Sequence, residues 1–326
     1  MSSRVVVARS GNTLRSLDAS LLVSCRDDGQ FLESFVQSVN SLVSVEVEVV
    51  LVDDGSSVPI DPGFLEHLKP RWTLIRTEHL GLPAALNLAA GFAASDFLAR
   101  HDLDDVSRPS RLWKQLQTLR DDHLDVVGSQ AWITDCNLNP LICTKLPLEH
   151  KTIGRWLLSR FSGNPIVHGS VLVRREMFLK VGGYDPRFIK SQDLDLWIRL
   201  LSHGAKFGNL PTPEYLWRAR AGSAGSSVGI SQSSFAQIAR SPMARGSSLA
   251  PPHSARRVRI QKRSDAFMAA SAGSWRGFHG VVICWWKVRK SLQLREHFRI
   301  ALFAVWSSKP MCYVRPLIRR RIRVRF

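Results

Sequence analysis

Three carboxylates stand within four positions of this chain, in the segment ARHDLDDVSRP at residues 99–109. They belong to Asp102, Asp104 and Asp105. Carboxylate oxygens are the ligands that hard divalent cations such as Mg²⁺ prefer, so this spacing is compatible with a cation site. The alternative is an acidic loop that is only solvated.

Two further acidic segments, SCRDDG and DDGSS, also come directly after apolar runs. Short apolar runs that end in turn residues predict strands at residues 19–24, 47–52 and 96–100, and the third leads into HDLDD. If these strands are parallel neighbours, their carboxyl ends lie at one edge of a sheet. Open α/β sheets bind ligands at that edge, so we expect the three acidic segments to gather there.

The rest of the body alternates between helical and strand periodicity. We expect helices at 29–42, 82–94, 109–119, 151–161 and 192–202, further strands at 72–76, 126–134 and 169–174, and a glycine turn at 181–185. Such alternation is typical of an α/β fold with a mainly parallel sheet flanked by helices.

The net charge of +18 over 326 residues is concentrated in one part of the chain. Residues 217–326 carry 22 Lys and Arg against two acidic residues, whereas the preceding part is close to neutral. We expect a linker rich in Ser, Gly and Arg at 221–264 and a basic, aromatic-rich tail at 265–326. Residues 280–326 suit a peripheral contact with an anionic membrane. Protein docking or self-association, nucleic-acid binding without a recognised module, and a tail without function are the alternatives.

The five cysteines are scattered and show no zinc-ligand spacing, which favours a reducing compartment. The apolar run near the amino terminus is too short for a signal peptide, and no run is long enough to span a membrane. We therefore predict a cytoplasmic protein, with contact at the inner face of the membrane through the tail.

Five motifs in this order resemble a family-2 glycosyltransferase with the GT-A fold. They are LLVSCRDDGQFL, VEVVLVDDGSS, GLPAALNLAAGFAASDFLARHDLDDVSRPSRLWKQ, NPIVHGSVLVRREMFLKVGGYD and SQDLDLWIRL. The resemblance implies a GT-A domain over residues 18–220, with a nucleotide-binding part at 18–108, an acceptor part at 109–220 and a leader at 1–17. The implied fold is a Rossmann-like mixed, mainly parallel sheet flanked by helices.

The resemblance also implies a donor site. The DxD motif corresponds to Asp102-Leu103-Asp104, with Asp104 on Mg²⁺ or Mn²⁺ and Asp102 on the metal or the ribose. We expect Asp105 to point away and cap the following helix. The base-binding positions correspond to Ser24, Arg26, Asp27, Asp53 and Asp54, with Asp54 favoured over Asp53. A turn that closes the strand is the alternative for this aspartate pair.

The last motif is expected to supply the general base that deprotonates the acceptor hydroxyl. The family pattern is Glu-Asp, and here it reads Gln192-Asp193, so we assign Asp193 as the base and place Gln192 on the acceptor side. The alternative is that Asp193 and Asp195 only stabilise a helix amino terminus. His168 is assigned to the acceptor side.

His101 is expected to be a packing or polar surface residue and Trp197 a core residue, whereas Asn87 and Arg100 are candidates for hydrogen bonds to the donor or within the structure. The sequence thus predicts an inverting transferase that moves a sugar from a nucleotide-diphosphate sugar, UDP-linked, to a glycan or lipid-linked acceptor in surface polysaccharide biosynthesis. A non-catalytic binding protein on the same scaffold, acting through its basic tail, is the rival prediction. Gln192 favours that rival, and the intact aspartates oppose it.

Overall fold

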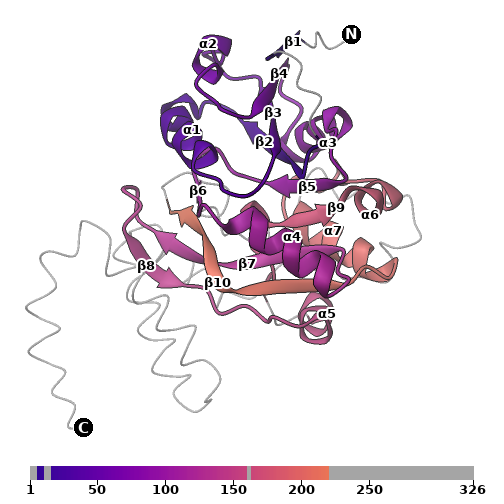
Figure 1. Cartoon of the computed structure of the whole chain (residues 1–326). Helices are drawn as coiled ribbons and strands as arrows, with labels where there is room; N and C mark the ends of the chain where they lie inside the picture. Colours follow the sequence, from indigo (N-terminus) through magenta and orange to yellow (C-terminus); the bar gives the residue numbers. More distant parts are fainter. Residues whose placement is uncertain (1–5, 11–15, 160–162, 220–326) are drawn as a thin grey trace, which may run out of the picture. The chain divides into compact units, whose positions relative to one another are not determined.

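The computed structural model describes residues 6–10, 16–159 and 163–219 (Figure 1). The strands of the described part are β1 (Val6–Arg9), β2 (Ala19–Cys25), β3 (Val47–Asp54), β4 (Arg71–Thr77), β5 (Phe97–Arg100), β6 (Val106–Ser107), β7 (Val126–Thr134), β8 (Pro140–Cys143), β9 (Leu172–Arg174) and β10 (Phe207–Arg218). The α-helices are α1 (Leu32–Asn40), α2 (Pro62–Leu65), α3 (Leu82–Phe92), α4 (Arg111–Asp121), α5 (His150–Leu158), α6 (Arg175–Lys180) and α7 (Gln192–Ser202). Short 3-10 turns lie at Gly29–Phe31 and His168–Ser170.

The strands form one mixed sheet in the order β1-β4-β3-β2-β5-β9-β7-β10-β6, with β8 paired to β7. β4, β3, β2 and β5 are parallel neighbours, and β9 runs antiparallel between β5 and β7. β7 and β10 are parallel to each other. Two antiparallel steps across β9 restore the direction of β5, so the carboxyl ends of β2, β3, β5, β7 and β10 all meet at one edge. The predicted α/β class and the gathering of acidic segments at this edge are confirmed.

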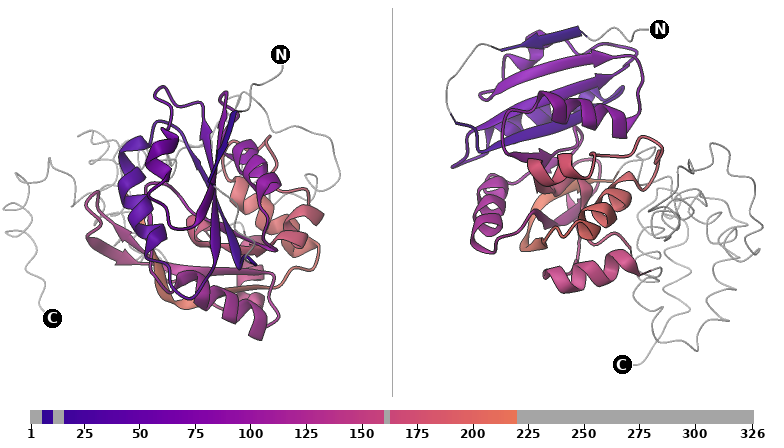
Figure 2. Two further views of the ribbon diagram at one scale, coloured as in Figure 1. Left: turned by 45° about the horizontal axis from the view of Figure 1, so that its top comes forward. Right: turned by 90° about the vertical axis from the view of Figure 1, so that its right-hand side faces the viewer.

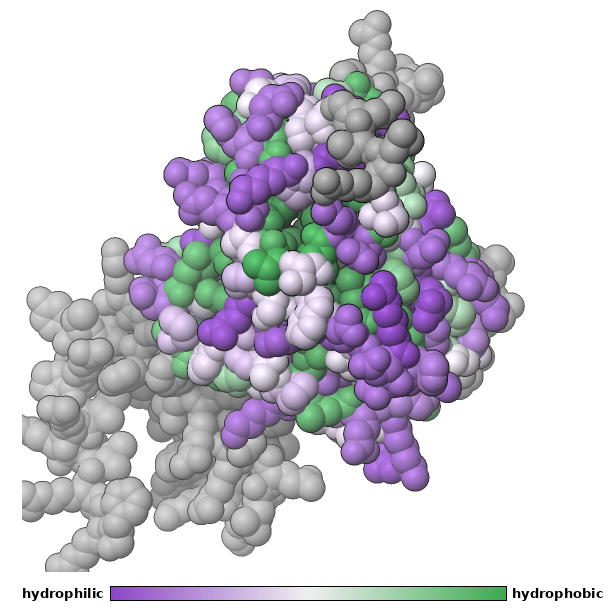
Figure 3. All heavy atoms as spheres, viewed as in Figure 1, coloured by the Kyte–Doolittle hydropathy of each residue, from purple (hydrophilic) through white to green (hydrophobic). Residues whose placement is uncertain are grey.

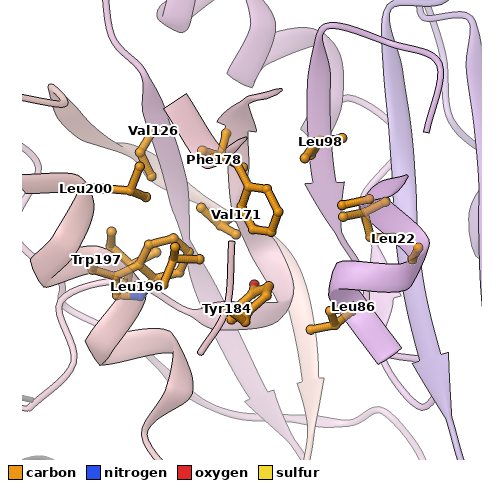
Figure 4. Close-up of a cluster of buried hydrophobic side chains, with 14 of the residues drawn as sticks. Leu22, Leu86, Leu98, Val126, Val171, Phe178, Tyr184, Leu196, Trp197 and Leu200 are labelled. Atoms are coloured by element: carbon orange, nitrogen blue, oxygen red, sulfur yellow. The ribbon is translucent and has the colours of Figure 1, made fainter. Parts of the chain in front are cut away.

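Helices cover both faces of the sheet (Figure 2). Each face has its own apolar core. One core packs α3 and α7 against the sheet, and the other packs α1 and α4 against the opposite face. The strand expected at residues 47–52 is present as β3, and every residue of it is buried, including Glu48, Asp53 and Asp54. Trp197 of α7 is fully buried beside Leu196 and Leu200, which confirms its structural role (Figure 4).

β10 was not predicted from the sequence, although it is the longest strand of the described residues. Pro211 and Pro213 lie inside it, and prolines in a run argue against a central strand. The pairing with β7 absorbs them through register shifts between Leu210 and Pro213 and between Pro213 and Tyr215. The irregular strand therefore still delivers Tyr215 and Arg218 to the edge where the acidic loops lie.

The amino-terminal segment adds a strand to the sheet. β1 pairs antiparallel with β4 through Val6 and Arg76, so part of the expected leader at 1–17 belongs to the fold. The expected helix at 151–161 ends at Leu158, and the linker at 221–264 and the tail at 265–326 lie outside the described residues. The membrane contact predicted for residues 280–326 falls in the same undescribed part.

Hydrophilic residues cover much of the face shown in Figure 3, with hydrophobic residues exposed between them near its centre. Among residues 6–10, 16–159 and 163–219, no helix is both long enough and apolar enough to cross a membrane.

Candidate active site

The acidic loop follows β5 and is held by Arg100, the last residue of that strand. Arg100 is 3% exposed, and its guanidinium donates to the carbonyl oxygens of Leu22 and His101 and to the carboxylate of Asp102. The backbone N–H of Asp102 donates to the hydroxyl of Tyr215 at 3.0 Å. Asp102 is therefore oriented from two sides, and a third of its side chain remains exposed.

Asp105 does not cap the following helix, so that prediction is wrong. α4 begins only at Arg111, and its N-cap is Ser110. The carboxylate of Asp105 turns inward, where its Oδ1 accepts from the backbone N–H of Arg218 at 2.8 Å. Burial raises the pKa of Asp105 well above its ordinary value, and the charges of Asp102 and Asp104 raise it further.

His101 is a packing residue, as expected from the sequence. It is fully buried between the rings of Phe35 and Tyr215, and its Nδ1 lies 2.7 Å from the carbonyl oxygen of Asp102. Burial, together with the charge of Arg111, holds the pKa of His101 well below its ordinary value. The ring is therefore neutral at pH 7 and donates from Nδ1 to that carbonyl.

Asp102 and Asp104 offer two carboxylates, and the described part of the chain holds no group of three or more His, Cys, Asp or Glu that could ligate a metal. Zinc sites are built from three or four protein ligands, so this donor set does not suit zinc. Mg²⁺ in phosphate-transfer sites is instead held by one or two carboxylates together with substrate phosphates. The residues present fit Mg²⁺ or Mn²⁺ that arrives with a diphosphate.

Asp53 closes the turn after β3 and is 1% exposed. Its carboxylate accepts from the N–H of Ser56 at 2.9 Å, from the N–H of Ile60 at 3.1 Å and from Nη1 of Arg76 at 2.7 Å. These contacts match the alternative interpretation of this residue as a strand-closing turn. Asp53 therefore shapes the loop from within.

Asp54 is 3% exposed, and its carboxylate is hydrogen-bonded to the segment at residues 77–81. One carboxylate oxygen accepts from the hydroxyl of Thr77 and the N–H of Leu80, and the other contacts Gly81 N–H and His79 Nδ1. A carboxylate has about four lone-pair sites, and these four contacts use them. The contact between Asp54 and a base stays a prediction that would require this segment to rearrange.

The loop after β2 is clamped to the turn after β3. The N–H of Asp27 donates to Ser56 Oγ at 3.0 Å, and Asp27 Oδ1 accepts from the N–H of Ser57 at 2.7 Å. Ser24 is partly buried at the end of β2, and Arg26 is exposed with its Nε 3.8 Å from Asp27 Oδ2. The structure brings all the predicted base-binding residues to one edge, where the side chains of Arg26 and Asp27 are exposed to a similar extent.

Asp193 lies in the first turn of α7, partly exposed. Its Oδ2 accepts from Asn164 Nδ2 at 2.6 Å, and its Oδ1 accepts from the N–H of Leu194 at 2.8 Å. Asp195 differs, because it is buried and pairs with Arg199 at 2.7 Å. Asp195 therefore has a structural role, and Asp193 also accepts from a backbone N–H at the helix start, so its role as the base stays a prediction. Gln192, the first residue of α7, is partly exposed beside Asp193.

His168 and Tyr184 lie between the two acidic regions. His168 Nε2 is 2.8 Å from the hydroxyl of Tyr184, and the two rings meet edge to face. Burial and the charge of Arg100 lower the pKa of His168 to about 4, while the charge of Asp193 opposes this shift. Burial raises the pKa of Tyr184, the charges of Asp193 and Asp102 raise it further, and the charge of Arg100 opposes the rise. Charges from both acidic regions therefore act on Tyr184.

A known protein family matches the part of the chain that forms this edge of the sheet. A family model described as glycosyl transferase family 2 matches residues 20–182, half of the chain. The chain belongs to glycosyl transferase family 2. The match includes every strand-end loop described above, and the mixed, mainly parallel sheet is that of a GT-A type glycosyltransferase. Asp193 lies beyond the matched residues, so its role stays a prediction.

Proteins similar to this family-2 glycosyltransferase are themselves named as glycosyltransferases or galactosyltransferases. The amylovoran biosynthesis glycosyltransferase AmsE of Erwinia amylovora is 29% identical over 214 residues, covering 63% of this chain and 76% of the relative. A UDP-Gal:alpha-D-GlcNAc-diphosphoundecaprenol beta-1,3-galactosyltransferase of Escherichia coli is 24% identical, covering 58% and 69%. The crystal structure of S. aureus TarS matches with a TM-score of 0.49 at 14% identity, covering 62% of this chain and 36% of that one.

Asn87 of this glycosyltransferase makes structural hydrogen bonds, one of the two roles expected for it, and Arg111 has a role that the sequence did not reveal. Asn87 donates to the carbonyl of Tyr184 at 2.7 Å and accepts from its N–H at 2.8 Å, across 97 positions. Gly183 has a positive φ, and a Cβ there would lie 2.5 Å from Asn87 Oδ1. Arg111 is fully buried and donates to the carbonyls of Arg100 and Gly169. The only sequence signal for these roles is that both residues lie inside the motifs.

His168 is expected to make the fold sensitive to acid. Between pH 6.5 and about 4 the unfolded chain binds a proton at His168 that the folded chain does not. The free energy of unfolding therefore falls with decreasing pH by up to about 1.4 kcal/mol per pH unit for each such histidine. His168→Gln should flatten the slope measured by denaturant unfolding at pH 7, 6 and 5. His203→Gln, at an exposed position, is the control, and an unchanged slope in His168→Gln would contradict the assignment.

Proposed function

We propose that this glycosyltransferase moves a sugar from a nucleotide-diphosphate sugar, UDP-linked, to a hydroxyl of a glycan or lipid-linked acceptor, with inversion at the anomeric carbon. The observation that carries the proposal is that Asp102 and Asp193, from two different segments, both lie close enough to the buried Tyr184 for their charges to raise its pKa. Asp104 belongs to the same acidic loop as Asp102. The name of the Escherichia coli galactosyltransferase, with a UDP-sugar donor and a diphosphoundecaprenol acceptor, supports the donor and acceptor classes. We propose that the reaction takes place on the cytoplasmic side of the membrane.

The donor side would hold the diphosphate. Asp104 and Asp102 would bind Mg²⁺ or Mn²⁺, which supplies positive charge to the diphosphate leaving group. Arg100 keeps Asp102 oriented from beneath through its guanidinium. Ser24, Arg26 and Asp27 surround the position where the first two strands end, and we assign the nucleotide to that position.

The acceptor side would supply the base. Asp193 takes the proton of the acceptor hydroxyl as its oxygen attacks the anomeric carbon, and the bond between that carbon and the diphosphate oxygen breaks. The electron pair of the broken bond leaves with the nucleoside diphosphate. Neutral His168, held by Tyr184, can donate or accept one hydrogen bond to a sugar hydroxyl without adding charge, and Gln192 can do the same.

A screen of nucleotide sugars tests the proposal. The full chain with Mn²⁺ should release a nucleoside diphosphate from at least one UDP-sugar, slowly with water and faster with an acceptor. Release from none of the nucleotide sugars would reject the transferase and favour the rival binding protein. Calorimetric titration with UDP, with and without Mn²⁺, then shows whether the scaffold binds nucleotide at all.

Asn164 is expected to position the base. Its amide donates to Asp193 Oδ2 and its own carbonyl accepts from the N–H of Ile166, so the side chain is fixed at both ends. Asn164→Ala should lower kcat by about 10- to 100-fold, because the carboxylate loses its orientation. The donor KM should stay within about threefold, since the contact lies away from the diphosphate side.

Asn139 offers a matched control, because its Nδ2 also donates to an aspartate carboxylate, Asp135, at an exposed turn. Asn139→Ala should retain wild-type kcat. Equal kcat values for the two variants would show that Asn164 does not act through Asp193.

A further inference from the structure

Arg218, the last residue of β10, is 7% exposed and binds parts of the chain far from it in sequence. We propose that Arg218 is the positioning residue of the acidic loop and that it holds Asp104 in the place from which it binds the divalent cation. The inference rests on the proposed function, since it specifies what keeps that cation site in shape.

The guanidinium of Arg218 has partners in three other segments. Its Nε donates to the backbone carbonyl of Asp104 at 2.6 Å, its Nη1 donates to the carbonyl of Cys136, and its Nη2 lies 3.4 Å from Ser34 Oγ. Its Cζ lies 5.2 Å from the centre of the Phe31 ring. The acidic loop is thus fastened to the turn between β7 and β8 and to the start of α1.

The hydrogen bond to Asp104 involves its carbonyl oxygen. This contact fixes the backbone of the loop without using the Asp104 carboxylate, which stays partly exposed. A guanidinium aimed at the carboxylate itself would compete with a cation for its oxygens. The hydrogen bond from Nε is instead made to the main chain of the loop.

The backbone of β10 completes the attachment. The N–H of Arg218 donates to Asp105 Oδ1, and the hydroxyl of Tyr215 accepts from the N–H of Asp102. Three of the four residues Asp102 to Asp105 are therefore held by the final four residues of one strand. The register of β10 against β7, with Arg218 opposite Thr134, sets the position of this attachment at the edge of the sheet.

Lysine cannot replace Arg218 in this role. Its ammonium is a compact point charge, whereas the planar guanidinium reaches several acceptors in fixed directions and stacks on a ring. Arg218→Lys keeps the charge and removes the fork, and Arg218→Ala removes both. The pair separates the geometric contribution from the electrostatic one.

The test measures Mn²⁺ binding to the full chain in the presence of UDP, by electron paramagnetic resonance of the free ion. Arg218→Lys should weaken the apparent Mn²⁺ affinity about 10- to 100-fold, as is typical when a group behind a metal ligand is lost. UDP binding without metal should stay within about twofold of wild type. Hydrogen exchange of the peptide that contains residues 101–105 should be faster in the metal-free variant.

Arg174→Lys is the matched control. Arg174 also ends a strand, pairs with Asp125 and lies 5.3 Å from the Phe97 ring, yet it faces the start of β5, at the opposite edge of the sheet. It should leave both Mn²⁺ affinity and exchange at residues 101–105 unchanged.

Wild-type and variant results answer different questions. Wild-type protein that binds UDP but shows no Mn²⁺ affinity would reject the cation site of the proposed function, and with it the cation-holding role of Arg218. Wild-type affinity and unchanged exchange in Arg218→Lys would overturn the role of Arg218 and leave the proposed function standing. If Arg218→Ala does not fold, Arg218→Lys alone carries the decision through both measurements.

Discussion

Asp104→Asn is expected to abolish metal-dependent binding of the donor. An amide oxygen carries no net charge, so the loop would lose a full negative charge where the cation must bind. The charge that the cation supplies to the diphosphate leaving group contributes several kcal/mol, so kcat/KM should fall roughly 1,000-fold. Titration with UDP in the presence and absence of Mn²⁺ measures the binding effect directly.

The fold should tolerate this substitution. The backbone carbonyl of Asp104, which accepts from Arg218, is unchanged in the asparagine variant. Removing one of three neighbouring carboxylates also reduces their mutual repulsion. Asp122→Asn, at an exposed position after α4, is the control for a lost surface charge. Full Mn²⁺-dependent UDP binding in Asp104→Asn would move the cation to other ligands and reject the assignment of the DxD motif.

The sequence predicted best those elements whose apolar residues follow a local pattern. β7 and α7 have the predicted bounds, because β7 begins with the buried apolar residues Val126 and Val127 and α7 shows an apolar helical face. β10 was missed because Pro211 and Pro213 lie inside it, and only the pairing with β7 shows how they are accommodated. Local composition cannot reveal such a partner.

In the candidate site, too, residue types and motif order could be read from the sequence, whereas contacts between distant segments could not. The carboxylates of Asp102, Asp104 and Asp193 could be selected from residue type and motif order. The sequence could not show that the carboxylate of Asp54 accepts hydrogen bonds from the segment at 77–81. Nor could it show that Asp105 accepts from the N–H of Arg218, 113 positions away. These contacts depend on strand register, so the prediction of a helix cap for Asp105 had no local signal against it.

Asp193→Asn is expected to retain donor binding and lose transfer. Asparagine matches the carboxylate in shape, and its oxygen can still accept from Asn164, but it cannot take a proton from the acceptor hydroxyl. General base catalysis contributes about 100- to 10,000-fold, so kcat should fall by that factor. The proposed donor site is the other acidic region, so the affinity for UDP with Mn²⁺ should stay within about twofold of wild type.

Asp195→Asn, two positions along the same helix, separates catalysis from helix stabilisation. Asp195 is buried and its carboxylate binds Arg199 through two hydrogen bonds, so its loss should lower the thermal midpoint and leave kcat largely intact. Asp193 accepts from the N–H of Leu194 and from Asn164, and neither contact requires a full charge. Its replacement should therefore shift the thermal midpoint little. If Asp193→Asn instead lowers stability and spares kcat, Asp193 only stabilises the helix start, and the base must be sought on another element facing His168 and Tyr184.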